Sequence, residues 1–357
     1  MKVILVIPTL ELAGAEVMCK NLALELKKEN HDVVVLSLYH HETALTNVIR
    51  SRDIRVIFLD KKPGLDITII GKLKKVFMIE KPDVVHTHLD SLKYSFVAAK
   101  LAKVPKCIHT VHNLAEKEAD KYARVIYRFA FKLGKVIPVA LSEEVQNSII
   151  DVYGIEKNNI PVIYNGIDLD ACIQKQSYTN NPKIIFINVA RFMHQKNHRM
   201  LINAYKKLTE QVDDTELWLV GKGQLLDEIR QQAERLHIIS RVRFLGERTD
   251  VLQLLNRADV FILPSLYEGM PMTIIEAMGT GLPIIATSVG GIPTMIEHDV
   301  DGCLVECDEG ELVEAMRKMC NYKERERMGK KAAEMATLKF SVKSMTEGYC
   351  RLYDGLS

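Results

Sequence analysis

Two carboxylates stand eight residues apart in the stretch Glu268-Gly-Met-Pro-Met-Thr-Ile-Ile-Glu276. Glu268 follows a buried-strand pattern, Asp259-Val-Phe-Ile-Leu-Pro264, which places it in a loop at the carboxyl end of that strand. Pro271 suits the first turn of a helix, and the apolar residues after it continue that helix through Glu276. A helix N-terminus attracts anions. Two acids around one helix start therefore predict a ligand with both hydroxyl groups and phosphate, such as a nucleotide sugar.

Two cations follow another predicted strand. Arg191 ends the strand candidate Lys183–Ala190, and Lys196 lies five residues further on, just before a helix. Two fixed cations suit a diphosphate leaving group, because they offset the charge that develops as the bond to the sugar breaks. Surface cations are common, so an ordinary solvated pair is the alternative. Their place at a strand end favours the binding interpretation.

Glycines occupy two further strand-to-helix connections. Gly14, followed by Ala15 and Glu16, joins the first strand to the first helix, and Gly221 and Gly223 close the strand that ends at residue 220. Glycine lets the backbone approach a ligand closely, and the helix that follows would face a phosphate. The alternative at each position is a plain tight turn.

His112 directly follows the strand candidate Cys107–Val111. An imidazole at a strand end could donate a hydrogen bond to a sugar hydroxyl or stabilise a developing charge. A histidine that only hydrogen-bonds within its loop is the alternative.

Length and composition narrow the class of protein. A chain of 357 residues exceeds the usual size of one hydrophobic core, and no window has the length of a membrane span. Seven scattered cysteines without a Cys-x-x-Cys pair predict free thiols in a reducing, cytoplasmic setting and no metal site. A net charge of +2 argues against a dedicated nucleic-acid binder. The segment 72–135 nevertheless holds 14 Lys and Arg against 6 Asp and Glu.

Short apolar runs alternate with helical patterns along the whole chain, which is typical of parallel sheets built from βαβ units. The expected strands are 2–7, 33–38, 55–59, 83–86, 107–111, 136–140, 183–190, 216–220, 242–245, 259–263 and 283–286. The expected helices include 16–29, 67–80, 197–208 and 224–236. The fold class is therefore α/β, with two Rossmann-like doubly wound parallel-sheet domains that face each other across a ligand cleft.

A polar stretch after residue 173 divides the two domains. We expect an N-terminal acceptor-binding domain at 1–170, a linker at 171–182 and a C-terminal nucleotide-sugar-binding domain at 183–340. A last helix at about 341–357 is expected to pack back on the first domain.

Taken in order, these motifs resemble the family-4 retaining glycosyltransferases of the GT-B fold, including the bacterial enzymes of cell-surface polysaccharide synthesis. The resemblance spans nearly the whole chain. It rests on Ala13-Gly-Ala-Glu16, His112, Asn165-Gly-Ile-Asp168, Arg191 with Lys196, Gly221-x-Gly223, and Glu268 followed by Glu276-Ala-Met-x-x-Gly-Leu-Pro283. Many members have two glycines where this chain has Ala13 and Gly14.

The resemblance implies a role for each matching residue. Glu276 would bind the ribose hydroxyls, Glu268 and His112 would face the donor sugar, and Arg191 with Lys196 would hold the diphosphate. The catalytic set would be His112, Glu268, Arg191 and Lys196. The remaining donor contacts would come from the two glycine loops and the start of the helix, namely Gly14, Ala15, Glu16, Gly221, Gly223, Gly269, Met270, Pro271, Met272 and Thr273. No metal or other cofactor is expected.

A row of cations lies within residues 116–135. Spaced as on one face of a helix, they are Lys117, Lys121, Arg124, Arg128, Lys132 and Lys135. Apolar residues are expected on the opposing face, namely Tyr122, Val125, Ile126, Phe129, Ala130 and Leu133. The row is interpreted either as a solvated helix face or as a peripheral docking site on an anionic membrane, which would suit a lipid-linked acceptor.

The predicted function is transfer of a hexose or N-acetylhexosamine from a nucleotide sugar to a glycan or lipid-linked acceptor in capsule, lipopolysaccharide or other polysaccharide synthesis. The resemblance implies that the nucleotide is UDP, which most members of the family use. Two enzyme alternatives share the fold: a nucleotide-sugar 2-epimerase and a phosphorylase. A non-catalytic nucleotide-sugar-binding protein is the alternative from another class. The sequence leaves the sugar, the acceptor, the linkage and the oligomeric state open.

Overall fold

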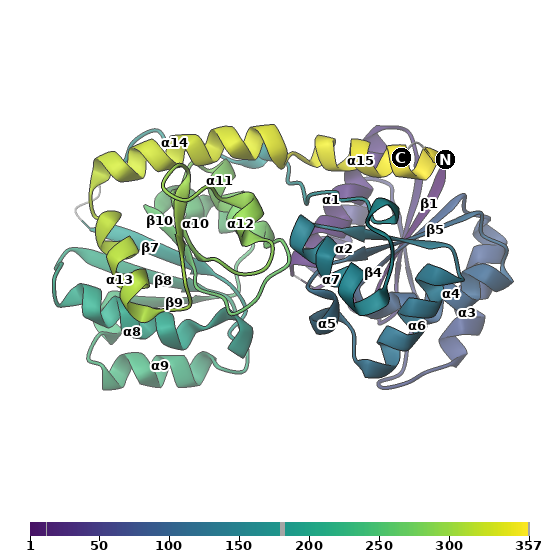
Figure 1. Ribbon diagram of the computed structural model, residues 1–357, viewed down its shortest axis with the longest axis horizontal. Coiled ribbons are helices and arrows are strands. Elements are labelled where there is room, and N and C mark those ends of the chain that lie inside the picture. The colour runs from purple at the N-terminus through teal and green to yellow at the C-terminus, as the bar shows by residue number, and fades with distance from the viewer. Residues whose placement is uncertain (12, 179–182, 356–357) are drawn as a thin grey trace. The chain divides into compact units, whose positions relative to one another are not determined.

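The computed structural model describes residues 1–11, 13–178 and 183–355, which form two compact units (Figure 1). The N-terminal unit comprises Met1–Ile167 and the last helix, which begins at Val342. The C-terminal unit comprises Asp168–Ser341. Each unit has a six-stranded sheet in which every neighbouring pair of strands is parallel. The α/β class and the doubly wound arrangement are therefore confirmed.

The strand order in the N-terminal unit is β3-β2-β1-β4-β5-β6. The central strand β1 is fully buried from its second residue onward, so side chains on both faces of the sheet are covered. The strand bounds are β1 Lys2–Ile7, β2 Asp32–Ser37, β3 Arg55–Phe58, β4 Val84–His88, β5 Lys106–Val111 and β6 Val136–Ala140. The helices are α1 Gly14–Lys28, α2 Ala44–Arg50, α3 Thr68–Glu80, α4 Leu92–Leu101, α5 Ala115–Glu118, α6 Lys121–Lys132, α7 Glu143–Tyr153 and α15 Val342–Asp354.

The strand order in the C-terminal unit is β12-β11-β10-β7-β8-β9. The strand bounds are β7 Ile184–Val189, β8 Thr215–Val220, β9 Val242–Gly246, β10 Val260–Leu263, β11 Ile284–Thr287 and β12 Gly302–Val305. The helices are α8 His198–Thr209, α9 Leu226–Arg235, α10 Val251–Arg257, α11 Met272–Gly279, α12 Ile292–Met295, α13 Glu309–Lys318 and α14 Tyr322–Lys339.

All eleven predicted strands are present, with bounds that differ by at most two residues. The structure adds β12, an edge strand that pairs with β11 and begins at Gly302. Its four residues include a glycine and a cysteine, so the apolar run is too short to be read as a strand. Crowding explains the glycine, because a Cβ at Gly302 would lie 2.6 Å from the carbonyl oxygen of Ile284.

Each sheet has one place where the chain reverses its direction of winding. The N-terminal sheet starts at β1, extends to β2 and β3, and then returns to place β4 on the other side of β1. The C-terminal sheet does the same with β7 and β10. The loops after two such neighbouring strands diverge to opposite faces of the sheet, and ligands of doubly wound sheets bind in the crevice between them. The fold therefore singles out the carboxyl ends of β1 and β4, and of β7 and β10.

The described part of the expected linker, residues 171–178, packs against the C-terminal unit. Tyr178 is buried and its hydroxyl donates to the carbonyl of Gly281 at 2.6 Å. The Lys175 amide donates to the carbonyl of Thr280, and the Lys175 ammonium lies 3.4 Å from a carboxylate oxygen of Asp259. These contacts fix the segment as a strap on one unit, and residues 179–182 lie outside the described part of the chain.

The last helix, α15, packs on α1 of the N-terminal unit (Figure 1). Its Tyr353 hydroxyl lies 2.8 Å from His86 Nδ1, and its Tyr349 hydroxyl lies 2.9 Å from Thr110 Oγ1. The same Thr110 oxygen lies 2.7 Å from His86 Nε2. A buried polar network therefore connects α15 with β4 and β5, the strands that carry two histidines of the candidate site.

The cation row predicted on a single helix is divided between two helices. Lys117 belongs to α5, a new helix starts at Lys121, and Lys135 lies beyond the end of that helix with a φ of 56°. The break occurs because Asp120 caps α6 by accepting from the amides of Tyr122 and Ala123. Lys121, Arg124, Arg128 and Lys132 remain together on α6.

The predicted apolar face of α6 is wrong in one important respect. Of its six residues only Ala130 is buried. The side chains that α6 directs into the core are Ala123, Tyr127, Ala130 and Phe131. The larger apolar residues of the predicted face are instead exposed to solvent, namely Tyr122, Val125, Ile126, Phe129 and Leu133.

Candidate functional site

A largely buried ion pair, with a buried carboxylate and a half-buried ammonium, joins the two loops at the reversal point of the C-terminal sheet. Lys196 follows β7, Glu268 follows β10, and the Lys196 ammonium contacts Glu268 Oε1. The same carboxylate oxygen accepts from the Ser265 hydroxyl at 2.7 Å. Glu268 is only 5% exposed. Because removing two charges from water often costs as much as their attraction returns, such a pair points to function rather than to stability.

The neighbouring backbone connects the same two loops. The Leu266 amide donates to the carbonyl of Gln195, and the Gln195 side-chain amide donates to the carbonyl of Tyr267, both at 2.8 Å. The Gln195 side-chain nitrogen also lies 3.5 Å from Glu268 Oε2. These contacts hold the Glu268 carboxylate independently of its lysine partner. Arg191 is exposed at the start of the β7 loop.

Gly221 and Gly223 shape the backbone that carries Arg191. Their φ angles are 141° and 155°. A Cβ at Gly221 would lie 2.1 Å from the carbonyl oxygen of Ala190, and one at Gly223 would lie 2.4 Å from that of Phe192. The two glycines therefore let the loop after β8 pass closely on both sides of Arg191, which gives them a packing role that the sequence left open.

Gly290, which sequence reasoning missed, lets the loop after β11 pass close to the backbone of Glu268. Its φ is 58°, in the left-handed region, and a Cβ there would lie only 1.7 Å from the carbonyl oxygen of Glu268. The amide of Gly291 donates to that same oxygen at 3.2 Å. The Gly290-Gly291 pair after β11 thus fixes the backbone of Glu268, and a glycine pair directly after a predicted strand was the available signal.

Helix α11 begins at Met272, one residue later than predicted, with Pro271 as its N-cap. No side chain of the described residues caps this N-terminus. Glu276 lies half-buried in the second turn. Burial and, second, the charge of Glu276 raise the pKa of the Cys172 thiol to about 12. The segment from Gly269 to Thr273 links the two acids through a helix start that is buried except at the half-buried Thr273.

The N-terminal unit supplies a second, separate group of predicted site residues. Gly14 is the first residue of α1, and it is exposed at a helix start that no described side chain caps. Ala15 follows half-buried, and Glu16 is buried, with a carboxylate oxygen that accepts from the Thr9 hydroxyl at 3.2 Å. Glu16 therefore holds the loop that precedes α1.

His112 is paired with a second histidine that sequence reasoning did not assign to the site. His88 ends β4, His112 follows β5, and His88 Nδ1 lies 3.0 Å from His112 Nε2. Burial lowers the pKa of His112 to about 4 and that of His88 well below its usual value, so both rings are neutral at pH 7. Glu118 of α5 accepts from the backbone amides of His112 and Asn113. His88 was detectable as a polar residue at the end of a predicted strand.

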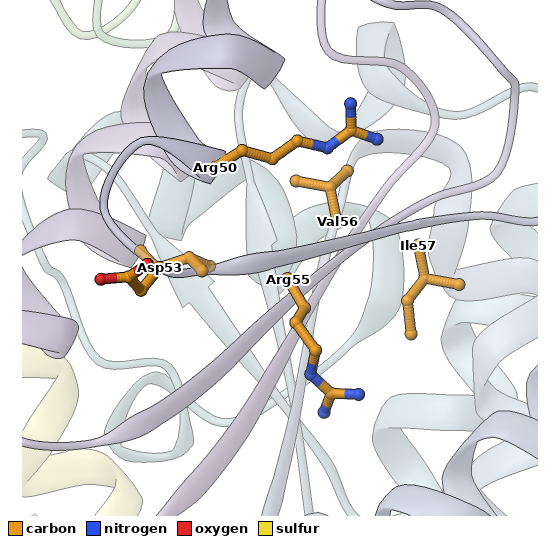
Figure 2. Close-up of a pocket in the computed structure, with 6 residues that line it drawn as sticks. Arg50, Asp53, Arg55, Val56 and Ile57 are labelled. Carbon is orange, nitrogen blue, oxygen red and sulfur yellow. The ribbon is translucent and has the colours of Figure 1, made fainter.

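One surface hollow lies away from both reversal points. It is lined by residues around the start of the edge strand β3, including Arg50, Asp53 and Arg55 (Figure 2). Arg55 forms two hydrogen bonds with Glu80, at 3.0 and 2.6 Å, which lowers the pKa of that carboxyl to about 2. This hollow lies at the amino end of β3, and Arg55 is already paired with Glu80. The hollow is therefore not the candidate site.

Comparisons with known proteins agree with this arrangement. The family description Glycosyltransferase Family 4 matches residues 12–171, and Glycosyl transferases group 1 matches residues 172–335. The solved structure of Anabaena HepE in complex with UDP and glucose has a TM-score of 0.88 at 20% identity over the full length of both chains. The fold of this chain is therefore the GT-B fold.

Relatives in sequence identify the family. The UDP-Gal:alpha-D-GlcNAc-diphosphoundecaprenol alpha-1,3-galactosyltransferase of Escherichia coli is 31% identical over 262 residues, which cover 68% of this chain and 67% of the relative. The N-acetyl-alpha-D-glucosaminyl L-malate synthase of Bacillus anthracis is 28% identical over 307 residues, which cover 82% and 79%. The chain belongs to the family-4 glycosyltransferases.

We predict that Gly290→Ala destabilises the C-terminal unit by about 1 to 3 kcal/mol more than Gly246→Ala. Both glycines have a positive φ, but a Cβ at Gly246 would have no atom within 4 Å. The control therefore carries only the conformational cost of about 1 kcal/mol. Urea unfolding followed by the fluorescence of Trp218, the only tryptophan and a residue of this unit, measures both. Equal losses would mean that the contact with Glu268 has no effect on stability.

A second prediction concerns His198, which is buried two residues after Lys196. Burial and, second, the charge of Lys196 lower its pKa to about 3. The unfolded chain then binds more protons below about pH 6.5, so stability falls on acidification from pH 6.5 toward 3, by up to about 1.4 kcal/mol per pH unit. His198→Leu should remove this contribution from the pH dependence of the urea midpoint. The exposed His237→Asn is the control, and an unchanged slope in His198→Leu would contradict the assignment.

Proposed function

We propose that this glycosyltransferase transfers a hexose or N-acetylhexosamine from a UDP-linked donor to a glycan or lipid-linked acceptor, with retention of the anomeric configuration and without a metal. The observation that carries the donor assignment is the buried Lys196–Glu268 pair at the β7/β10 reversal point, beside the start of α11. Cations, a carboxylate and a helix N-terminus are the groups that a phosphorylated sugar requires.

In this proposal the phosphates lie against Arg191, Lys196 and the N-terminus of α11. Those fixed positive charges replace the metal ion that other nucleotide-dependent enzymes use to offset charge on the leaving diphosphate. Gly221 and Gly223 contribute by holding the backbone on either side of Arg191. Glu276, about one turn into α11, binds the ribose hydroxyls, and Glu268 binds hydroxyls of the sugar.

The N-terminal unit contributes His112 and the start of α1. A neutral imidazole can donate a hydrogen bond to a sugar hydroxyl through one nitrogen while the other meets His88. We assign His112 to the donor sugar near its reacting carbon, and the amides of Gly14 and Ala15 to the phosphates. His88 acts as a positioning residue, because it fixes the ring orientation of His112 from a site with no solvent access.

Retention follows if the leaving group assists the acceptor. The bond between the anomeric carbon and the phosphate oxygen breaks, and the acceptor oxygen forms its bond to that carbon on the same face. The proton of the acceptor hydroxyl passes to the departing phosphate oxygen. This series of steps requires no enzyme nucleophile. Catalysis then depends on the groups that stabilise negative charge on the diphosphate.

The relatives support the proposed donor and acceptor classes. The E. coli relative's name gives UDP-Gal as donor, a diphosphoundecaprenol-linked sugar as acceptor and an alpha-1,3 linkage. The solved HepE structures hold UDP, glucose or UDP-glucose. A nucleotide-sugar 2-epimerase is the alternative within the fold, and it would convert the donor when no acceptor is present. A non-catalytic binder would leave the donor unchanged in every mixture.

We predict that Glu276→Gln and Glu268→Gln separate binding from turnover. Loss of the ribose contact should weaken UDP binding roughly 10- to 100-fold, because hydrogen bonds to a charged group contribute about 1.5 to 3 kcal/mol. Glu268→Gln should lower kcat about 100-fold or more while UDP affinity changes little, since its proposed contact is to the sugar. Calorimetry with UDP and initial-rate kinetics measure the two effects.

Two controls accompany that comparison. Glu334→Gln changes an exposed acid on α14 and should alter neither quantity. Trp218 fluorescence checks that Glu268→Gln folds, because this variant leaves Lys196 without its carboxylate partner. Unchanged UDP affinity in Glu276→Gln would overturn the assignment of Glu276.

The stereochemistry and the metal requirement form a separate prediction. An α-linked nucleotide sugar should give an α-linked product, observed by proton NMR of the anomeric signal, and EDTA should leave the initial rate unchanged. A β-linked product would exclude the same-face mechanism. A rate that EDTA abolishes and Mg²⁺ restores would exclude the assignment of the phosphate charge to Arg191 and Lys196 alone.

A further inference from the structure

Helix α6 exposes a continuous apolar stripe. The exposed fractions are 86% for Tyr122, 66% for Val125, 59% for Phe129 and 67% for Leu133, and Ile126 is also exposed. Positions 122, 125, 126, 129 and 133 follow the spacing of one helical face. The helix is nevertheless well packed, because its other face buries Tyr127 and Phe131 in the core. The stripe is thus an addition to the core-forming face and does not replace it.

Cations form a second stripe beside the apolar one, exposed except at the half-buried Arg124. From residue 121 to residue 135 the chain has five cations and no acid, namely Lys121, Arg124, Arg128, Lys132 and Lys135. None of them lies within ion-pair distance of a carboxylate in the described residues. At 100° per residue Lys121, Arg124, Arg128 and Lys132 occupy the sector between the buried face and the apolar stripe, and Lys135 follows beyond the end of the helix. Around the helix the order is therefore core, cations, apolar side chains.

The neighbouring helices also expose apolar side chains. Helix α4 packs against both α3 and α6, so the three helices form one layer on the N-terminal unit (Figure 1). Val97 and Leu101 of α4 and Met78 and Ile79 of α3 are exposed apolar residues of this layer. Most of the cations of segment 72–135 lie on these helices and in the loops next to them. A contiguous exposed apolar patch marks an interaction site, and on α6 this patch lies beside a row of cations.

We propose that the α6 face docks on an anionic lipid bilayer, with α6 lying parallel to the membrane plane and its apolar stripe inserted below the headgroups. A contact surface for another protein would explain the exposed apolar residues. It would not explain five neighbouring cations without an acid. Anionic lipid satisfies both, since cations bind headgroups while Phe129 and Leu133 reach the acyl boundary. At 12 residues, about 18 Å, α6 lies on a bilayer and does not span it. No described helix could cross one.

This inference deepens the proposed function, because a docked enzyme would meet a lipid-linked acceptor at the surface that holds it. It does not depend on the donor assignment. Docking is a property of α6, whereas donor binding is assigned to the β7/β10 end of the C-terminal unit, with His112 and the start of α1, none of which belongs to α6. The two can therefore fail separately.

The test uses co-sedimentation of the full-length protein with vesicles of phosphatidylcholine alone and of phosphatidylcholine with 30% phosphatidylglycerol, a composition chosen for the assay. We expect at least 10-fold stronger binding to the anionic vesicles, and a loss of binding at high salt. Val125→Gln with Phe129→Gln should weaken binding at least 10-fold, because the stripe loses its inserted side chains. Lys121→Gln with Lys132→Gln should weaken it about 10-fold and flatten the salt dependence.

A matched control lies on α14, in the other unit. Leu338 is 67% exposed, the same as Leu133, and Lys323 is an exposed cation of the same helix. Leu338→Gln with Lys323→Gln should leave vesicle binding unchanged. Insertion itself is read from Phe129→Trp in a Trp218→Phe background, whose single tryptophan should shift to the blue on anionic vesicles only.

Each contrary result has a defined meaning. Equal binding to neutral and anionic vesicles, or no blue shift, would overturn the docking proposal. So would concentration-dependent dimerisation in light scattering that Val125→Gln with Phe129→Gln abolishes, since the stripe would then belong to an interface between two copies. UDP binding is measured in parallel: vesicle binding without UDP binding would contradict the proposed function and leave the docking proposal standing.

Discussion

The arrangement of the site depends on one constraint, the parallel sheet that is wound in both directions. A parallel pair needs a helical crossover, and a right-handed crossover can extend the sheet only one way until the chain returns to its first strand. At that return two neighbouring loops leave toward opposite faces and open a crevice. Lys196 and Glu268 stand on the two loops of one such crevice, and the Gly14 loop and His88 stand on those of the other. These polar groups therefore lie where doubly wound sheets bind their ligands.

The Lys196–Glu268 pair shows how the fold tolerates buried charge at such a point. Breaking a buried pair typically costs several kcal/mol, yet keeping one contributes little, so the surrounding contacts decide whether the carboxylate stays in position. Ser265 donates to it, Gln195 lies beside it, and Gly290 lets the next loop press on its backbone. The carboxylate is thus oriented by neutral groups as well as by the cation. Lys196 can therefore exchange its contact with Glu268 for one with a ligand, while neutral groups keep the Glu268 carboxylate in position.

Sequence reasoning located the strands and the residues at their ends because both depend on local patterns. A buried parallel strand is a continuous apolar run, and Glu268, Arg191 and His112 lie in the loops that follow such runs. It missed contacts that depend on neighbouring strands, such as Gly290 against Glu268 and His88 against His112. These pairs are separated by more than twenty residues, and only the strand order brings them together. The short edge strand β12 was missed for the opposite reason, since four residues carry too little pattern.

Helix α6 also shows that a local sequence pattern does not determine how an element packs. Periodicity separates the faces of a helix but does not say which face meets the core, because two apolar stripes are present and only one can be buried. The stripe with the larger residues was the natural candidate, yet the core accepts Ala123, Tyr127, Ala130 and Phe131, whose two alanines let the helix lie close to its neighbours. A helix already anchored by one apolar face gains nothing in folding from a second. The stability of the fold therefore does not account for the exposed apolar stripe, whereas binding to a partner would.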